Sequence, residues 1–329
     1  MLTYITRIWY NKKIKIFYYI ILSPFEFIFK IIVLIRKNLY KYNILKSHKF
    51  NIPVIVVGNI TVGGTGKTPL VIYIANYLKN LGYNPGIISR GYKSLVNGVN
   101  LVTKDLNPII FGDEPVLLAN ATNCSVVIGK DRVATIKYLL KNFNNINIII
   151  SDDGLQHYKL KRDLEIAVID GYRQFGNEHL LPLGPLREPI SRLETVDIVV
   201  SNDKQVLDYK YIIKLVPNKC YNLIDPNNIA DITKFNKVHA VAGIGNNQRF
   251  FDLLKNLGLQ LMEHSFPDHY NFKPEDLNFF DDLPIIMTEK DAVKCAAFAK
   301  NNFWCQTVIV KINLEQEFNS YLINKIKTK

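Results

Sequence analysis

Short apolar runs alternate with longer segments of helical periodicity between residues 51 and 202. Each run is rich in valine and isoleucine and ends in a polar or glycine-bearing loop, which is the pattern of buried parallel strands joined by helices. The runs cover residues 54–57, 86–89, 124–128, 146–150, 165–169 and 196–200. The pattern predicts an α/β fold with a doubly wound parallel sheet, in which ligands bind at the carboxyl ends of the strands.

A second α/β pattern follows in the last part of the chain. Its strand-like runs are residues 238–242, 284–288 and 307–311. Its helical segment is residues 249–257. Neither an internal repeat nor a low-complexity linker separates it from the first pattern, so the boundary near residue 202 is approximate. We predict a first α/β domain at residues 51–202 and a second, smaller one at residues 203–329.

The stretch from residue 17 to residue 35 is apolar except for Ser23, Pro24, Glu26 and Lys30. On a helix a narrow polar stripe forms, so such a helix is too apolar for water; the stripe consists of Ser23, Glu26, Lys30, Lys37 and Lys41. A charged pair near its middle is also unfavourable at a bilayer centre. We therefore predict an interfacial helix that lies on a membrane surface. A spanning helix, a cleaved signal peptide without a clear cleavage site and a helix buried in protein are the alternatives.

Charge is concentrated in the same part of the chain. Residues 1–50 hold ten lysines and arginines against one acid, and so carry +9 of the net charge of +12. A basic segment of this kind favours anionic lipid headgroups, whereas the small excess elsewhere argues against a general nucleic-acid binder. The four cysteines show no C-x-x-C spacing and indicate a reduced, cytosolic protein. We therefore predict a membrane-associated segment at residues 1–50 and no nucleic-acid partner.

A glycine-rich loop joins the first predicted strand to a helix, with the sequence Gly-Asn-Ile-Thr-Val-Gly-Gly-Thr-Gly-Lys-Thr at residues 58–68. Glycines let backbone amides converge on phosphate, Lys67 reaches the β- and γ-phosphates, and the Thr68 hydroxyl binds Mg²⁺. The predicted nucleotide-binding residues are Thr61, Val62, Gly63, Gly64, Thr65, Gly66, Lys67 and Thr68. Thr61 departs from the usual phosphate-loop pattern, which has glycine at this position.

Two further groups of polar residues suit phosphate and metal chemistry. Asp152 and Asp153 end an apolar strand, as the carboxylate of a nucleotide site does when it meets Mg²⁺ or its water shell. An aspartate that only caps a helix is the alternative. Arg187 and Glu188 lie between prolines and suggest a phosphate contact and a metal-binding or hydrogen-bonding carboxylate.

A kinase that phosphorylates a hydroxyl gains from a carboxylate or imidazole base near the acceptor. The candidates are Asp113, in Gly-Asp-Glu-Pro, and His269, in Phe-Pro-Asp-His-Tyr. A role in a turn or a helix cap is the alternative for both. The sequence leaves open which of the two takes the proton.

Taken together, the motifs resemble those of the tetraacyldisaccharide 4′-kinase family over about residues 50–295. They are the phosphate loop, Ser-Arg-Gly-Tyr, Gly-Asp-Glu-Pro, Asp-Asp-Gly-Leu-Gln-His, Pro-Leu-Gly-Pro-Leu-Arg-Glu-Pro, Phe-Pro-Asp-His-Tyr and Thr-Glu-Lys-Asp-Ala-Val-Lys, in this order. The family has threonine at the position of Thr61. The resemblance implies an ATP- and Mg²⁺-dependent kinase that phosphorylates the 4′-hydroxyl of a tetraacyl glucosamine disaccharide 1-phosphate, giving lipid IVA in lipid A biosynthesis.

The resemblance also implies roles for individual residues. Lys67 has a catalytic role beside the general base Asp113, and His269 pairs with that base. The metal-binding group is Thr68, Asp152, Asp153, Gln156 and Glu188, and Arg187 contacts phosphate. The two domains are implied to close over the nucleotide and bring His269 onto the Asp113 loop. The basic N-terminal segment resembles the family's membrane helix and implies a place at the cytoplasmic face of the bacterial inner membrane, on a glycolipid substrate.

Two other functions fit the nucleotide motifs. One is a regulatory or transport NTPase, although the guanine-selecting Asn-Lys-x-Asp motif does not occur and Thr-Glu-Lys-Asp at 288–291 has its lysine one position late. The other is a membrane scaffold that uses nucleotide only to hold its shape. Dependence of nucleotide turnover on an acceptor lipid distinguishes a kinase from both.

Overall fold

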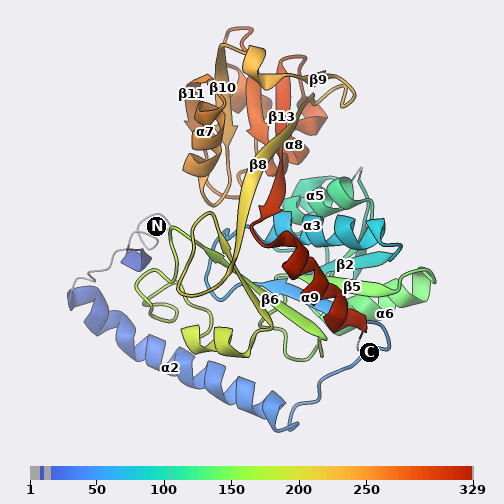
Figure 1. Ribbon diagram of the computed structural model, residues 1–329. Helices are drawn as coiled ribbons and strands as arrows, with labels where there is room; N and C mark the ends of the chain where they lie inside the picture. Colours follow the sequence, from blue (N-terminus) through green and yellow to red (C-terminus); the bar gives the residue numbers. More distant parts are fainter. Residues whose placement is uncertain (1–7, 11–15, 105, 328–329) are drawn as a thin grey trace.

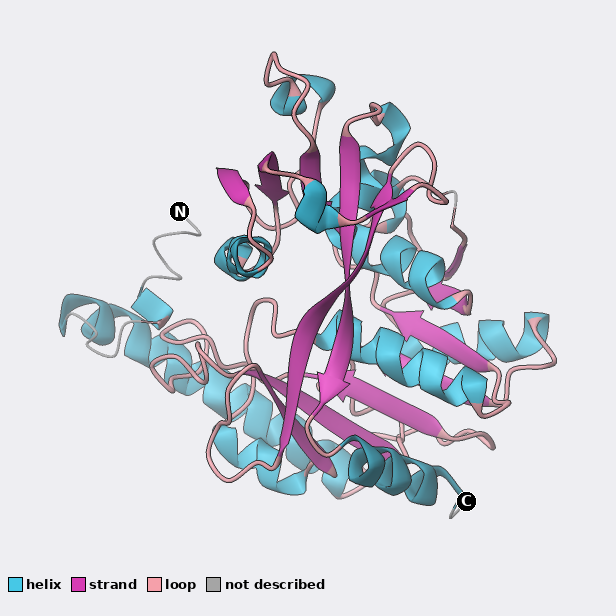
Figure 2. Ribbon diagram, turned by 45° about the horizontal axis from the view of Figure 1, so that its top comes forward, coloured by secondary structure: helices cyan, strands magenta, loops and turns pink. Residues whose placement is uncertain are grey.

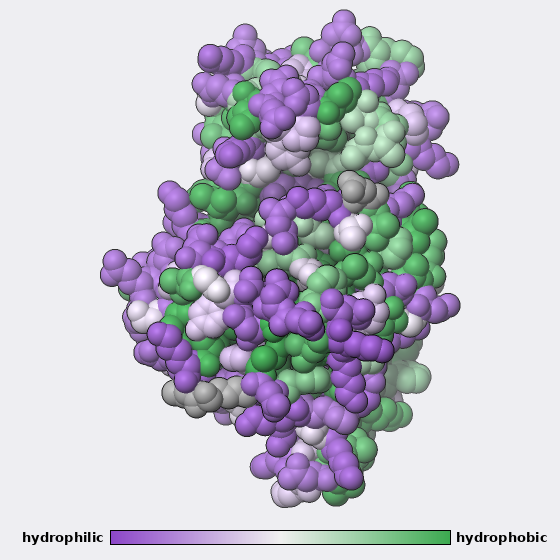
Figure 3. Space-filling view, turned by 90° about the vertical axis from the view of Figure 1, so that its right-hand side faces the viewer, coloured by the Kyte–Doolittle hydropathy of each residue, from purple (hydrophilic) through white to green (hydrophobic). Residues whose placement is uncertain are grey.

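The computed structural model describes residues 8–10, 16–104 and 106–327, and one continuous sheet runs through it (Figures 1 and 2). Within these residues the sheet has 13 strands, in the order β11-β10-β12-β13-β8-β7-β6-β1-β5-β2-β4-β3, with β9 paired to β8. A smaller upper lobe and a larger lower lobe are visible in the space-filling view (Figure 3). The predicted α/β fold is confirmed.

The lower lobe contains the parallel part of the sheet. Its strands are β1 (Val54–Gly58), β2 (Pro85–Ser89), β4 (Ser125–Ile128), β5 (Ile148–Asp152), β6 (Leu164–Asp170) and β7 (Ile198–Asn202), with β3 (Asn100–Val102) antiparallel at the edge. All six predicted runs are therefore strands. Their residues are almost entirely buried because helices or loops cover both faces, as the unbroken valine and isoleucine runs require.

Helices cover the two faces of this part of the sheet. On one face lie α3 (Lys67–Asn80), α5 (Asp113–Thr122) and the C-terminal α9 (Glu315–Lys327), with the short α4 (Pro108–Phe111) beside α5. The other face is covered by α6 (Arg132–Asn142) and by loops that follow β5 and β6. The helix after the phosphate loop packs through the predicted periodic positions, which are Leu70, Val71, Ile74, Ala75 and Leu78.

The upper lobe is built on two long antiparallel strands, β8 (Tyr211–Asn222) and β13 (Phe303–Ile312), which run between the lobes (Figure 2). Its other elements are β9 (Ile229–Ala230), β10 (Lys237–Ala242), α7 (Asn247–Asn256), β11 (Gln260–Ser265), β12 (Ile285–Thr288) and α8 (Glu289–Cys295). Short 3₁₀ helices cover Ile190–Thr195, Ile232–Lys234, Pro274–Leu277 and Ala296–Phe298. The helix α9 returns to the lower lobe, where Phe318, Leu322 and Ile326 join its core. The domain boundary at residue 202 coincides with the end of β7 and stays a prediction.

The N-terminal helix α2 (Ile16–Lys41) lies along the lower lobe (Figure 1). None of its residues is buried, although it is mostly apolar, and it alone among the described helices is long and apolar enough to cross a membrane. Glu26 ties its middle to the lobe, since its carboxylate accepts the Leu180 N–H at 2.8 Å and lies 3.0 Å from His179 Nδ1. The predicted helix is confirmed, and its acid faces the protein.

Candidate active site

The phosphate loop connects β1 to α3 at the carboxyl ends of the parallel strands. Gly66 has φ of 95° at the N-cap of α3, and no side chain of the described residues caps this helix end. A Cβ at Gly66 would lie 2.3 Å from Asn202 Nδ2, so glycine is required there by both conformation and space. Gly63 has φ of 107° with open space beside it. The first-turn amides of α3 are thus available to an anion.

Threonine at position 61 has a structural explanation. Thr61 forms an antiparallel bridge with Leu186, and the Val62 N–H donates to the Pro185 carbonyl at 2.8 Å. The Arg187 N–H in turn donates to the Ile60 carbonyl at 2.6 Å. This part of the loop is therefore extended, and Thr61 is absent from the positive-φ positions of the described chain, so glycine is not needed here.

Two acids at the end of β5 lie beside the loop in opposite electrostatic settings. Asp153 lies 3.5 Å from Lys67 Nζ and 3.0 Å from Arg187 Nη1. Burial raises its pKa, but these two cations outweigh burial and hold it well below the ordinary value. Asp152 is 1% exposed, and its Oδ1 has no hydrogen-bond partner among the described residues. Burial, followed by the charge of Glu114, raises the pKa of Asp152 to about 7.

The predicted metal-binding residues separate into two sets. Asp152 has a buried carboxylate oxygen without a partner among the described residues, which suits a cation, and Thr68 is the second residue of α3, after the phosphate loop. The metal roles of Asp152, Thr68 and Asp153, whose carboxylate is paired with Lys67 and Arg187, stay predictions. In contrast, Glu188 is 2% exposed and accepts hydrogen bonds from Tyr158 and, at 2.9 Å, from Gln156 Nε2. Both carboxylate oxygens of Glu188 thus have protein partners, and its metal role, like that of Gln156, stays a prediction.

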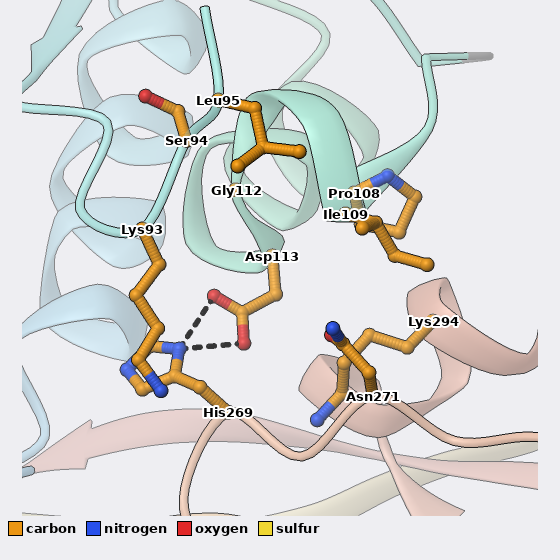
Figure 4. Close-up of a pocket in the computed structure, with 10 residues that line it drawn as sticks. All are labelled: Lys93, Ser94, Leu95, Pro108, Ile109, Gly112, Asp113, His269, Asn271 and Lys294. Atoms are coloured by element: carbon orange, nitrogen blue, oxygen red, sulfur yellow. Dashed lines mark hydrogen bonds and ion pairs between the residues drawn. The ribbon is translucent and has the colours of Figure 1, made fainter.

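Asp113 and His269 meet although 156 positions separate them in the sequence. Asp113 is the first residue of α5 in the lower lobe, and His269 follows β11 in the upper lobe. Nδ1 of the histidine lies 2.9 and 2.8 Å from the two carboxylate oxygens (Figure 4). Burial raises the pKa of Asp113, but the His269 hydrogen bond and the Lys290 charge reverse the shift and hold it at about 2.

A cavity of about 440 Å³ opens beside this pair. It is lined by Lys93, Ser94, Leu95, Pro108, Ile109, Gly112, Asp113, His269, Asn271 and Lys294 (Figure 4). The lining combines cations, apolar side chains and the Asp113 carboxylate. The cavity thus gives a polar acceptor with apolar substituents access to Asp113.

The two groups of residues form one site. Glu114 influences Asp152 in the phosphate-loop group, and its carboxylate lies 3.1 Å from Lys290 Nζ, beside the histidine. The upper lobe also reaches the phosphate loop directly, because a Cβ at Gly245 would lie 3.0 Å from Gly64 N. Contacts between lobes therefore occur at both ends of the site.

Sequence patterns missed several residues that the structure brings to the site. Asn202 donates to the Thr65 carbonyl at 3.0 Å, and Gly245 lies over the phosphate loop. Both residues follow predicted strands. Because ligands of such sheets bind at the carboxyl ends of the strands, this position was the signal in the sequence that could have identified them as site residues. Lys290 was visible only as part of the Thr-Glu-Lys-Asp motif.

Known proteins match the chain over almost its whole length. The sequence model of the tetraacyldisaccharide-1-P 4′-kinase family matches residues 18–327. A tetraacyldisaccharide 4′-kinase of Nitrosococcus oceani is 45% identical over 98% of this chain and 94% of its own. One from Methylobacillus flagellatus is 47% identical over 89% and 88%, respectively.

A solved structure is similar in fold as well. The crystal structure described as the "apo" form of LpxK from Aquifex aeolicus in complex with ATP superposes with a TM-score of 0.77. That protein is 32% identical in sequence, and the match covers 92% of this chain and 98% of the other.

Proposed function

This chain belongs to the tetraacyldisaccharide-1-P 4′-kinase family, and on that premise we propose how its residues transfer the γ-phosphoryl group of ATP to the 4′-hydroxyl of a tetraacyl disaccharide 1-phosphate. The enzyme is a kinase of lipid A biosynthesis, and the product is lipid IVA. We call residues 58–68 with Asp152, Asp153 and Arg187 the nucleotide side. Asp113, His269 and the adjoining cavity form the acceptor side.

On the nucleotide side, the loop amides and the first turn of α3 bind the phosphates of ATP. Lys67 stabilises the charge that grows on the transferring phosphoryl group. Thr68 and Asp152 would hold Mg²⁺, which neutralises phosphate charge when it is bound. The assignment is supported by Asp152 Oδ1, which is buried and has no hydrogen-bond partner in the described part of the chain. The described residues include no group of three His, Cys, Asp or Glu side chains placed to hold a metal, and Mg²⁺ usually needs only one or two carboxylates beside substrate phosphates.

On the acceptor side, the contact between Asp113 and His269 carries the proposal. An ionised carboxylate 2.8 Å from an imidazole, at the edge of a cavity, is placed to receive a hydroxyl proton. The pair requires both lobes, whereas an enzyme that only hydrolyses ATP needs no such base beside a second cavity. We therefore favour a kinase with a hydroxyl acceptor over the NTPase and scaffold alternatives.

We propose that α2 lies in the cytoplasmic surface of the inner membrane. Twelve large apolar side chains of this helix are exposed, from Ile16 to Ile35. The helix lies along the lower lobe (Figure 1), and Glu26 at its middle binds the loop at residues 179–180, which favours an interfacial position over a spanning one. The basic flanks favour anionic lipids, and reduced cysteines and ATP use fit the cytoplasmic side.

The test of function is acceptor-dependent turnover. Purified full-length protein receives ATP and Mg²⁺ with the tetraacyl disaccharide 1-phosphate in detergent micelles, and ADP and phosphorylated lipid are measured together. We expect ADP and phosphorylated lipid in equal amounts, and little ADP when lipid is left out. A 4′-deoxy analogue of the lipid should give no phosphorylated lipid. ADP release at the same rate with and without lipid would instead support an NTPase.

The test of membrane attachment uses charge on the apolar face. Ile28→Asp with Ile32→Asp should weaken sedimentation with anionic vesicles at least about tenfold, because each buried isoleucine contributes roughly 1.5–3 kcal/mol. Ile229→Asp, an equally exposed position in the upper lobe, is the matched control. Unchanged vesicle binding by the α2 variant would identify another surface as the anchor.

A further inference from the structure

Asn202 is a buried polar residue that contacts the phosphate loop from another part of the sheet. It is the last residue of β7, and its side chain is completely buried. Its Nδ2 donates to the Thr65 carbonyl at 3.0 Å, across 137 positions of the sequence. The direction of this hydrogen bond is fixed, because a carbonyl only accepts and Nδ2 is the donor of the amide. Asn202 therefore holds one peptide group of the phosphate loop, between Thr65 and Gly66.

The sheet holds the backbone on both sides of Asn202. Its carbonyl accepts the Gly171 N–H at 2.9 Å, and the N–H of Asp203 donates to the Ile213 carbonyl at 2.8 Å. Asp203 is also ion-paired with Arg249 of the upper lobe at 2.8 Å. The amide of Asn202 thus extends from a rigid strand end, which can position a loop more precisely than another loop could.

The phosphate loop lies directly against this amide. A Cβ at Gly66 would be 2.3 Å from Nδ2 of Asn202, so the loop has no room to move closer to β7. The bond between Thr65 and Gly66 is trans, and its N–H therefore points away from its carbonyl and from Asn202. Gly66 is the N-cap of α3, and no side chain of the described residues caps this helix end. Its N–H thus adjoins the first-turn amides that can bind an anion.

Two buried polar atoms at this contact have no partner in the described part of the chain. They are Oδ1 of Asn202 and Oγ1 of Thr65. A side chain that serves only packing gains nothing from such an oxygen, because burying a polar group without a hydrogen bond costs free energy. The presence of an asparagine here is therefore explained by the hydrogen bond that its Nδ2 donates.

We propose that Asn202 is a positioning residue for ATP binding, whose hydrogen bond to the Thr65 carbonyl turns the Gly66 N–H toward the phosphates. This proposal rests on the proposed function, in which residues 58–68 bind ATP. If this peptide group turned over, a carbonyl oxygen would face the phosphates in place of an N–H, and an attraction would become a repulsion. Glycine at position 66 imposes little steric barrier to that change, so a second residue has to select the orientation.

Removal of the donor should weaken nucleotide binding. Asn202→Leu fills the space but donates no hydrogen bond at any pH. Its Kd for ADP with Mg²⁺, measured by calorimetry without lipid, should be about 10- to 100-fold higher than that of the native protein, as expected for a lost hydrogen bond to a charged group. Native affinity of Asn202→Leu would overturn the proposal.

Asn202→Asp separates the donor from the shape of the side chain. Aspartic acid has the shape of asparagine but donates only when it is protonated, and burial favours the protonated form. The variant should therefore bind ADP weakly at pH 8, and the ratio of its Kd to the native Kd should decrease as the pH is lowered to 5.5. A ratio that does not decrease toward low pH would show that the donor does not set the affinity and would overturn the proposal.

A buried asparagine of the upper lobe is the matched control. Asn222 is 4% exposed, and its Nδ2 donates to the Asn301 carbonyl at 2.7 Å, away from the phosphate loop. Asn222→Leu and Asn222→Asp should keep the native Kd for ADP, and thermal unfolding scans check that all variants are folded. Native and variant proteins share the charged groups around the end of β7, so the ratio of Kd values reports the introduced carboxyl group. These groups include Asp170, Asp203, Lys214 and Arg249.

A crystal structure of the native protein with ADP and Mg²⁺ tests the proposal even if the variants do not fold. We expect Asn202 to donate to the Thr65 carbonyl and the Gly66 N–H to donate to a phosphate oxygen. A Gly66 N–H directed away from the phosphates would refute the role of Asn202. Native protein that binds no ADP would contradict the proposed function as well, whereas equal binding by native protein and Asn202→Leu would contradict this inference alone.

Discussion

The nucleotide side of the site comes mainly from one continuous stretch of chain, whereas the acceptor side joins residues 156 positions apart. Residues 58–68 form the phosphate loop through local turns and one helix end. Asp113 and His269 instead depend on β8 and β13, which connect the lobes and set where β11 ends relative to α5. A motif of local origin forms wherever its strand and helix form, but a pair between lobes exists only while the lobes keep their relative position.

The two sides also differ in how their buried acids are compensated. Asp113 has a histidine and nearby lysines, and its pKa is about 2. Asp152 has one oxygen without a partner among the described residues, and its pKa is about 7. Hence the acceptor side is electrostatically complete in the protein alone, whereas the nucleotide side has an acid suited to an added cation.

The largest expected effect is on the nucleotide side. Lys67→Ala should lower kcat at least about 1,000-fold without unfolding the protein, because Lys67 meets charge that develops in the transition state. Turnover with the lipid acceptor and a thermal unfolding scan measure the two quantities. Lys141→Ala, at an exposed position in the last turn of α6, is the control and should be fully active. Near-normal turnover by Lys67→Ala would contradict the assignment of residues 58–68 as the loop that binds the phosphates of ATP.

An intermediate effect is expected where the upper lobe touches the phosphate loop. Gly245→Ala and Gly245→Val should lower kcat/KM for ATP progressively, by about tenfold for valine, because the new Cβ lies 3.0 Å from Gly64 N and forces the lobes apart. Ile244→Val, one position earlier, adds no atom and is the control. Identical kinetics for glycine, alanine and valine at 245 would mean that this contact has no part in turnover.

The smallest effect is a pH-dependent difference in stability. The folded pKa of Asp113 lies below its unfolded value near 3.9, so its ionisation contributes stability above that pH, lost as pH falls toward 2. The quantity to compare is the free energy of unfolding of the native protein minus that of Asp113→Asn. This difference should decrease by up to about 2 kcal/mol as the pH is lowered from 5 to 2. Urea titrations measure it, with Asp282→Asn, on an exposed loop, as the control. A difference independent of pH would show that His269 and Lys290 do not stabilise the ionised Asp113 carboxylate in the folded protein.

The same comparison explains what the sequence could predict. Strands β1, β2, β4, β5, β6 and β7 were predictable because both faces are buried and their apolar runs are continuous. Strand β8 was not, since it is half exposed and includes Pro217, and β11 is a largely polar edge strand. Lys290 and Gly245 act across the lobes, and no spacing along the chain encodes such a contact. The pairing of Asp113 with His269 came from resemblance to a family rather than from residue patterns.

The central claim is that Asp113 and His269 act as one unit on the acceptor, and a double-mutant cycle in kcat tests it most directly. Asp113→Asn, His269→Ala and the double variant are compared with the native enzyme under saturating ATP and lipid. Each single variant should lose about 100-fold or more, and the double variant should lose much less than the product of the two. Losses that multiply fully would show that the two residues act separately and would contradict this account of the acceptor side.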